Sequence, residues 1–216
     1  MTNRAARFAA TLLAVACLGG TLSACAPVVL GGTAMGVLVA TDRRTSGAQL
    51  EDEGIQLRAA GRIREAVGDR VHVNITSYNR QVLLTGEVPS AQDRQLVEQI
   101  VSRVENVRAI VNELGVMGNS SLTQRSSDSL VTGRVKAAMV DAKDIFANSF
   151  KVVTERGTTD LMGRVTQREA NRATDITRST PGVQRVVRVL EIITEEELQR
   201  TLPQEPPKAT SPAPKA

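Results

Sequence analysis

An internal repeat constrains the fold of this 216-residue chain more than any other feature of the sequence. The segment VLLTGEV at residues 82–88 returns in altered form as TDLMGRV at residues 159–165, so that Gly86 aligns with Gly163. A pattern that returns at a spacing much longer than one helix or strand indicates a duplicated unit. The sequence therefore predicts two modules of one fold, with both glycines at tight positions that a side chain would obstruct.

The residues before each glycine have the pattern of a β-hairpin. Alternating polar and apolar residues at 71–76 and 150–154 predict half-buried strands. Residues 79–80 and 156–157 lie where the hairpin turns are required. Each glycine is therefore expected in the second strand of a hairpin.

A helix and another strand are predicted after each glycine. Ser90 and Thr166 each lie three positions before a carboxylate, which is the pattern of a helix N-cap. β-Branched residues then predict closing strands at 107–114 and 183–193. The helix after Ser90 has one apolar stripe, formed by Leu96, Val97, Ile100, Val101 and Val104.

One more helix precedes each hairpin, at residues 52–67 and 128–142. Their apolar residues, which recur on one helix face, are Ile55, Ala59, Ile63, Val67, Val131, Val135 and Met139. The order helix-strand-strand-helix-strand, present twice, predicts an α+β fold with two tandem modules. A right-handed crossover to the third strand places both helices on one face of a three-stranded mixed sheet. Because aromatic residues are 2% of the chain, we expect aliphatic cores.

Residues 1–24 have the pattern of a signal peptide. Arg4 and Arg7 precede an apolar run at residues 8–18, which is too short to span a bilayer. The last three residues of this segment and the cysteine that follows them, Cys25, form the sequence LSAC, which resembles the bacterial lipobox. The resemblance implies acylation of Cys25 and anchoring of the chain in a membrane.

The cysteines leave one alternative open, an ordinary secretory signal after which Cys25 is a free thiol. Cys17 is a weaker candidate for acylation because little apolar sequence precedes it. Neither cysteine lies in the repeated region, so no disulfide is expected there. An aspartate directly after the acylated cysteine would resemble an inner-membrane retention signal. This chain has Ala26 at that position, which favours the outer membrane as the destination.

Composition separates the modules from the chain ends. Glycines weaken any helix in residues 25–49, which we interpret as a tether after the lipidated cysteine. Residues 195–216 end in a run rich in Pro, Ala and Lys, which predicts a disordered tail. The predicted modules and the linker between them occupy residues 50–116, 125–194 and 117–124, respectively.

The element order, the central glycine and a closing GVQRV at residues 182–186 resemble the BON domain over roughly residues 50–194. Gly182, directly before Val183, is a further structural glycine of this pattern. The first copy has Asn106 at the equivalent position, directly before Val107. With the lipobox and TDRRT at 41–45, the chain resembles dual-BON outer-membrane lipoproteins. The resemblance implies a non-catalytic protein in the inner leaflet, facing the periplasm. Such a protein supports envelope integrity and contacts anionic phospholipid through its second module.

Candidate catalytic and cofactor residues are scarce. The chain has one histidine, His72, which alternates with Val71 and Val73 and is expected to face solvent. No His, Cys and carboxylate spacing predicts zinc, and the early glycines form no phosphate loop, so we predict no enzyme, metal or cofactor. The acidic residues 51–53 are interpreted as favourable charges at a helix start.

Charge distinguishes the two copies. Residues 51–114 contain eight basic and ten acidic residues, a net charge of −2, whereas residues 125–194 contain twelve and eight, a net charge of +4. Opposite signs in related modules indicate different partners. The predicted lipid-binding residues of the second module are Leu130, Arg134, Lys136, Arg164, Arg168 and Arg172.

Other interpretations of this basic surface stay open. It is also compatible with a solvated face, or with an adaptor that docks an envelope protein or the cell wall. Secretion excludes nucleic acid as a partner. Two residues depart from the lipid-binding family: Leu130 stands where relatives can place an exposed aromatic, and Asp160 is a poor membrane contact at the hairpin.

Overall fold

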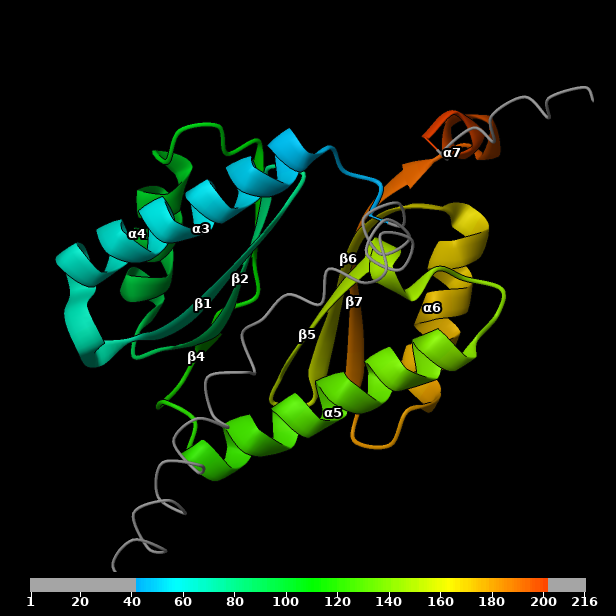
Figure 1. The fold of residues 1–216 in the computed structure, drawn as a ribbon. Coiled ribbons are helices and arrows are strands. Elements are labelled where there is room, and N and C mark those ends of the chain that lie inside the picture. The colour runs from blue at the N-terminus through cyan, green and yellow to red at the C-terminus, as the bar shows by residue number, and fades with distance from the viewer. Residues whose placement is uncertain (1–41, 202–216) are drawn as a thin grey trace, which may run out of the picture. The chain divides into compact units, whose positions relative to one another are not determined.

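The structure is a computed structural model, and it describes residues 42–201 (Figure 1). Cys25, the predicted signal peptide and residues 202–216 of the predicted tail lie outside this range. No helix between residues 42 and 201 has the length and apolar character needed to cross a membrane.

The first module contains two α-helices and one mixed sheet. Strand β2 lies between β1, with which it is antiparallel, and β3, with which it is parallel, while the short β4 extends the β3 side. The elements are α3 (Ser46–Val67), η2 (Gly68–Arg70), β1 (His72–Tyr78), β2 (Gln81–Val88), α4 (Ala91–Ser102), β3 (Ala109–Asn112) and β4 (Gly115–Val116).

The second module repeats this arrangement. Strand β6 is antiparallel to β5 and parallel to β7, in the order β5-β6-β7. The elements are α5 (Leu122–Asp141), η3 (Ala147–Ser149), β5 (Phe150–Glu155), β6 (Thr158–Thr166), α6 (Gln167–Ser179), β7 (Arg185–Ile193) and α7 (Glu195–Thr201). The predicted α+β fold of two tandem modules is therefore confirmed.

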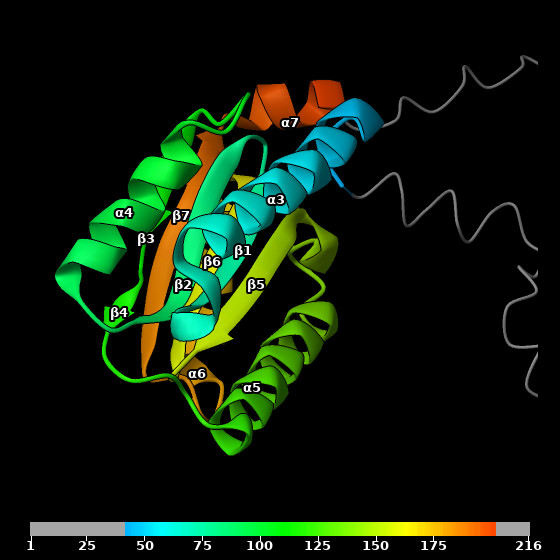
Figure 2. The same cartoon turned by 90° about the vertical axis from the view of Figure 1, so that its left-hand side faces the viewer.

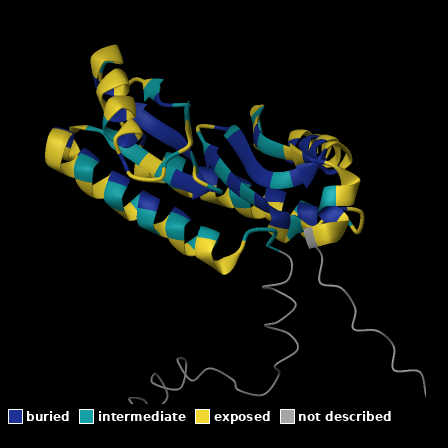
Figure 3. Cartoon of the chain, turned by 90° about the horizontal axis from the view of Figure 1, so that it is seen from above, coloured by how far each residue is buried: buried dark blue, intermediate teal, exposed yellow. Residues whose placement is uncertain are grey.

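Each pair of helices covers one face of its own sheet, as Figure 2 shows for α3 and α4 in front of β1 and β2. The core beneath α3 and α4 joins the predicted stripe of α3, which includes Ile55 and Ile63, to Leu84 of β2. The equivalent core of the second module joins Val135 of α5 to Leu161 of β6. In Figure 3 the strands are mostly buried, whereas the helices alternate between buried and exposed residues.

The other face of each sheet is also covered. Leu84 faces the helices, whereas its neighbour Leu83 points to the opposite side of the sheet. There Leu83 and Tyr78 of the first module pack against Met162 and Val189 of the second. The two sheets therefore share a small apolar core, which explains why seven of the eight residues of β2 are buried.

The predicted hairpin turns are present in both modules. Asn79 and Arg80 join β1 to β2, and Arg156 and Gly157 join β5 to β6. All four residues have positive φ, between 49° and 73°. Two successive residues of this kind are typical of the type I′ turn, whose twist matches that of the flanking strands. Asn106, which replaces a glycine before the closing strand, also has positive φ, 68°.

The repeat glycines lie against the backbone of a neighbouring segment. A Cβ atom on Gly86 would lie 2.1 Å from the carbonyl oxygen of His72, and one on Gly163 would lie 2.4 Å from that of Ser149. Gly86 also has a φ of +110°, whereas Gly163 does not have positive φ. At Gly182, with φ +101°, an added Cβ would meet Val131 at 2.5 Å. The obstruction at Gly86 and Gly163 comes from carbonyl oxygens and not from a helix.

The largest differences from the predicted element boundaries are at two helix starts and in the predicted tail. Helix α3 begins at Ser46 and α5 at Leu122, because Thr45 and Ser121 accept hydrogen bonds from the backbone as N-caps, one to two turns before the apolar stripes begin. The predicted tether and linker are therefore shorter. Residues 195–201, predicted as tail, form α7, whose Leu198 is buried.

Candidate functional site

The predicted lipid-binding helix, α5, exposes three large apolar side chains among polar and small residues on its outer face. Its inner face is buried through Val131, Val135 and Met139, so the opposite face points away from the module core. The large apolar side chains on the outer face are Leu122, Leu130 and Val140, which are 80%, 63% and 69% exposed. Arg134 and Lys136 are exposed on the same helix. Neither belongs to an ion pair within the described residues.

The three other predicted lipid contacts are engaged within the module. Arg164 lies on β6 and forms ion pairs with Glu191, at 3.3 Å, and with Glu197. Arg168 donates to the carbonyl oxygen of Asp144 at 2.9 Å, and Arg172 forms an ion pair with the Asp144 carboxylate at 2.9 Å.

The structure brings together two of the predicted basic residues. Arg134 and Arg172 both line a groove between α5 and α6, where the Arg134 guanidinium donates to the carbonyl oxygen of Pro181 at 3.5 Å. Arg164 and Arg168 do not line this groove. The six predicted residues are therefore not one continuous surface.

Two buried aspartates hold the hairpin turns, and the sequence analysis missed this role. On α3, Asp52 accepts hydrogen bonds from the backbone N–H groups of Asn79 and Arg80, both at 2.8 Å, and from the Ser77 hydroxyl at 2.6 Å. Although burial opposes ionisation, hydrogen bonds from Ser77, Arg80 and Arg44 hold the pKa of Asp52 below its usual value. The interpretation of Asp52 as a helix-start charge is wrong, because α3 begins six residues earlier.

Asp128 occupies the same place on α5. It accepts hydrogen bonds from the backbone N–H groups of Arg156, at 2.9 Å, and Gly157, at 3.1 Å. The sequence does contain a signal for this role, because each copy has an aspartate in its predicted first helix. In the first copy this aspartate, Asp52, stands within the acidic run at 51–53 and was interpreted together with its neighbours. Both modules thus join their first helix to their hairpin turn through one carboxylate.

The segment before α3 binds both modules. Arg43 forms two hydrogen bonds of 2.7 Å with the carboxylate of Glu169, at the start of α6, and a third of 3.0 Å with the carbonyl oxygen of Arg164. The side chains of Arg43 and Glu169 are 4% and 1% exposed, respectively. Arg44 pairs with Asp52 at 2.7 Å, and its guanidinium lies 4.3 Å from the centre of the Tyr78 ring. Residues predicted as tether therefore belong to the folded unit.

A polar cluster connects the hairpins of the two modules. The buried carboxylate of Glu87 accepts a hydrogen bond from Arg156 Nε of the second module at 2.7 Å, and its other oxygen lies 2.8 Å from His72 Nδ1. Burial opposes ionisation of Glu87, but Arg156, His72 and Ser120 hold its pKa below the usual value. The His72 side chain is 17% exposed, so the prediction that it faces solvent is wrong. Glu87 contacts its ring, and the carboxylate of Glu155 from the second module lies within 4.8 Å of a ring nitrogen.

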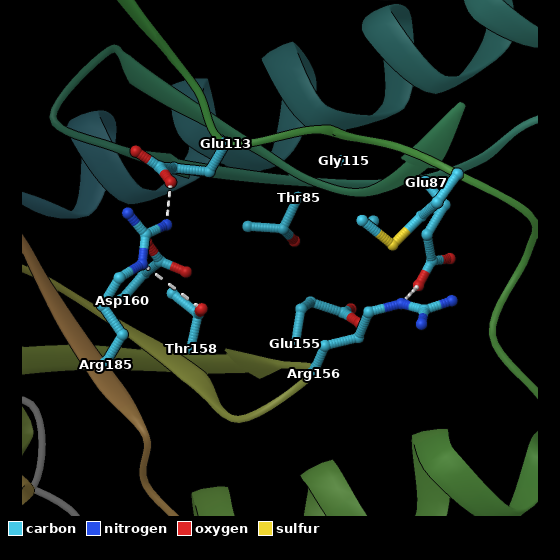
Figure 4. Close-up of a pocket in the computed structure, with 11 residues that line it drawn as sticks. Thr85, Glu87, Glu113, Gly115, Glu155, Arg156, Thr158, Asp160 and Arg185 are labelled. Carbon is cyan, nitrogen blue, oxygen red and sulfur yellow. Dashed lines mark hydrogen bonds and ion pairs between the residues drawn. The ribbon is translucent and has the colours of Figure 1, made fainter. Parts of the chain in front are cut away.

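A cavity of about 170 Å³ lies beside this cluster and is lined by both modules (Figure 4). Asp160 lines it, is 1% exposed, and has no hydrogen-bond partner for either carboxylate oxygen. Burial, together with the negative charge of Glu113, raises the pKa of Asp160 from 3.8 to about 7. The first copy has Leu83 at the equivalent position. Asp160 thus faces the other module and not a membrane, which corrects the sequence interpretation.

The raised pKa of Asp160 predicts a pH-dependent stability. Because the pKa is higher in the folded state than in the unfolded state, the stability associated with protonated Asp160 is complete below pH ~4 and is lost as pH rises through ~7. Asp160→Asn should therefore stabilise the chain by about 1–4 kcal/mol at pH 8 and change little at pH 4. Urea unfolding in the presence of EDTA measures this difference, and an effect that is the same at both pH values would contradict the assignment.

The repeated helix-strand-strand-helix-strand units, each with a hairpin turn held by one carboxylate, define a protein of two tandem α+β modules of one fold. The model of the family described as BON domain matches residues 56–118 and 127–194, and the chain belongs to this family. The chain is similar to the outer membrane lipoprotein DolP of Haemophilus influenzae, with 36% identity over 180 residues, 82% of this chain and 93% of that protein. It is also 27% identical over 154 residues to the 21 kDa hemolysin of Actinobacillus pleuropneumoniae, covering 70% of this chain and 79% of that protein.

Among solved structures, the C-terminal domain of CdsD, a structural protein of the type III secretion system of Chlamydia trachomatis, aligns with 64% of this chain and 99% of its own. The sequence identity is 12% and the TM-score 0.28, a score too low to support an argument.

Proposed function

We propose that this chain is an outer-membrane lipoprotein that is acylated on Cys25, faces the periplasm from the inner leaflet and supports envelope integrity without catalysing a reaction. The similarity to DolP over most of both chains supports the outer membrane and the lipoprotein anchor. The LSAC sequence that ends at Cys25 supports acylation of that residue. Cys25→Ser should release the chain from the membrane fraction, and sedimentation of this variant with outer membranes in high salt would contradict the anchor.

The second BON module is the proposed site for anionic phospholipid, and the outer face of α5 is the observation that carries this proposal. Leu122, Leu130 and Val140 are exposed there, and Arg134 and Lys136 lie beside them. Exposed apolar side chains can insert between lipid headgroups while neighbouring cations contact the anionic phosphates. Each cation near an anionic surface contributes about 1 kcal/mol, so this face orients an already anchored module.

Vesicle co-sedimentation tests the α5 surface. The chain from residue 26 onward should bind vesicles of phosphatidylglycerol and not those of phosphatidylcholine, and salt should weaken the binding. Arg134→Glu combined with Lys136→Glu should weaken it by at least about tenfold, because each reversal replaces an attraction of about 1 kcal/mol with a repulsion. Leu130→Ser should also weaken binding, since it removes apolar area from the contact.

The matched control reverses two exposed charges on the first module, Arg64→Glu with Arg103→Glu, and should leave binding unchanged. A second comparison, Arg164→Gln with Arg168→Gln, tests the predicted residues that have partners within the module. Equal loss in the control and the α5 variant, or binding to both lipids alike, would exclude this surface. The alternative of an adaptor would then be favoured, and crosslinking in cells would identify its protein or cell-wall partner.

A further inference from the structure

Three side chains from the two modules converge on one point beside the inter-module cavity. His72 and Glu87 of the first module and Glu155 of the second each offer a ligand atom, and these atoms all lie within 4.8 Å of one another. The His72 Nδ1 to Glu87 Oε2 distance is 2.8 Å. A nitrogen and two carboxylate oxygens from separate strands are a donor set that proteins use for divalent metal ions.

The charges around the cavity are not balanced by the protein. Four carboxylates line it, from Glu87, Glu113, Glu155 and Asp160, together with two arginines. Arg156 pairs with Glu87 and Arg185 pairs with Glu113, as the dashed lines in Figure 4 mark. Within the described residues, neither Glu155 nor Asp160 has a cationic partner. The buried carboxylate of Asp160 and the partly buried one of Glu155 therefore lack a counter-charge, an arrangement that is costly for the charged form unless a cation compensates it.

Unsatisfied oxygen atoms in the same cavity point to a ligand independently of the acidic cluster. Both carboxylate oxygens of Asp160 and the hydroxyl oxygen of Thr85 are buried without a hydrogen-bond partner, and both residues line the cavity. Nearly all buried polar atoms in proteins have a partner, so three orphaned oxygens facing one cavity indicate a missing one. Figure 4 shows Thr85 and Asp160 on opposite sides of the cavity, from the sheets of the two modules.

We propose that this site binds one divalent transition-metal ion of the zinc type, with His72, Glu87 and Glu155 as ligands and Asp160 and Thr85 as the polar wall of its open side. Histidine favours zinc over calcium or magnesium, which prefer oxygen ligands. Donors on one zinc ion lie roughly 3.3 Å apart, so the His72–Glu87 pair opens slightly and Glu155 moves inward. Arg156 binds the other oxygen of Glu87, and the backbone N–H and the hydroxyl of Ser120 donate to Oε2 at 3.2 Å, so the ion would share this carboxylate with both residues.

The proposed ion joins the two modules and does not depend on the lipid-binding proposal. The ligands come from β1, β2 and β5, and α5, which carries the proposed lipid surface, supplies none of them. Zinc binding should therefore raise the melting temperature of the chain and leave its preference for anionic vesicles intact. Three protein ligands leave one position for water, which the cavity is large enough to hold.

The test uses the full chain in detergent, with Cys17→Ser and Cys25→Ser so that no thiol competes for the metal. Titration calorimetry with ZnCl₂ should give one ion per chain, and Co²⁺ should give a visible absorption band whose position depends on His72. His72→Gln and Glu155→Gln should each weaken zinc binding by at least about tenfold. Glu65→Gln, an exposed carboxylate on α3, is the matched control and should bind zinc like the parent chain.

Several outcomes would overturn the proposal. These are absence of one-to-one binding at micromolar zinc, full affinity in either ligand variant, and calcium or magnesium binding that does not respond to His72→Gln. Melting temperatures in EDTA show whether each variant folds without metal. If His72→Gln does not fold, Glu155→Gln decides the question alone, because Glu155 lies at the end of β5 and its carboxylate is only partly buried, with a hydrogen bond from the Asn74 side chain.

Discussion

Replacing Arg43 with alanine is expected to destabilise the folded chain by about 3–5 kcal/mol, because the change leaves the carboxylate of Glu169 buried without its counter-charge. The loss exceeds that of a surface ion pair, since both side chains are almost fully covered and the guanidinium binds both carboxylate oxygens at 2.7 Å. Equilibrium urea unfolding measures it.

A double-mutant cycle separates the ion pair from simple loss of packing. Glu169→Gln removes the buried charge while its amide oxygen still accepts from the Thr166 N–H group, so Arg43→Ala should cost much less in that background. Arg64→Ala, an exposed arginine on α3, should change stability by less than about 0.5 kcal/mol. Equal costs of Arg43→Ala in both backgrounds would show that the pair contributes nothing beyond packing.

Gly86→Val is expected to have a comparable effect, about 4 kcal/mol or more, because two separate conflicts arise at this position. A Cβ atom would lie 2.1 Å from the His72 carbonyl oxygen, which belongs to the backbone of β1 and cannot rotate away. The φ of +110° is also one that a β-branched residue avoids. Urea unfolding or the loss of folded protein reports the effect.

Gly163→Val provides a graded comparison at the equivalent position. Its Cβ would meet the Ser149 carbonyl oxygen at 2.4 Å, but its φ is not positive, so a smaller loss of about 1–3 kcal/mol is expected. Gly61→Ala on α3 is the control with opposite sign, since nothing lies within 4 Å and alanine favours the helix by up to about 1 kcal/mol. Equal effects at Gly86 and Gly163 would contradict the role of φ.

The sequence predicted those parts of the fold that local patterns determine. The hairpin turns at 79–80 and 156–157 were predicted from residue types that occur in turns, and these residues have positive φ in the structure. The N-caps Ser90 and Thr166 were predicted from the carboxylates three positions later. These signals act within a few residues. Helix starts were placed too late because the apolar stripe of α3 begins after the cap at Thr45.

The polar cluster and the cavity beside it depend on contacts between the two modules, which the sequence pattern of either module alone does not predict. His72 alternates with valines and was expected in solvent, but the second module covers that face of β1 and buries Glu87 beside it. Asp160 stands where the first copy has an apolar residue, and nothing in the neighbouring sequence explains the difference. In the structure its side chain lines a cavity that it shares with residues of the other module's sheet. The exposure of Arg134 and Lys136 could be predicted from the helical pattern alone, because no acidic side chain within residues 42–201 forms an ion pair with either of them.

The bond between Arg43 and Glu169 also bears on the order in which the chain folds. The two residues are 126 positions apart, and Arg43 precedes the first module whereas Glu169 lies late in the second. A chain that emerges N-terminus first, as every chain does during synthesis, exposes the first module before Glu169 has emerged. Such non-local contacts slow folding because a long loop must close before they form. The Leu83 face of the first module's sheet therefore stays uncovered until the second module has emerged and folded, and an apolar sheet face that is exposed during this interval favours aggregation.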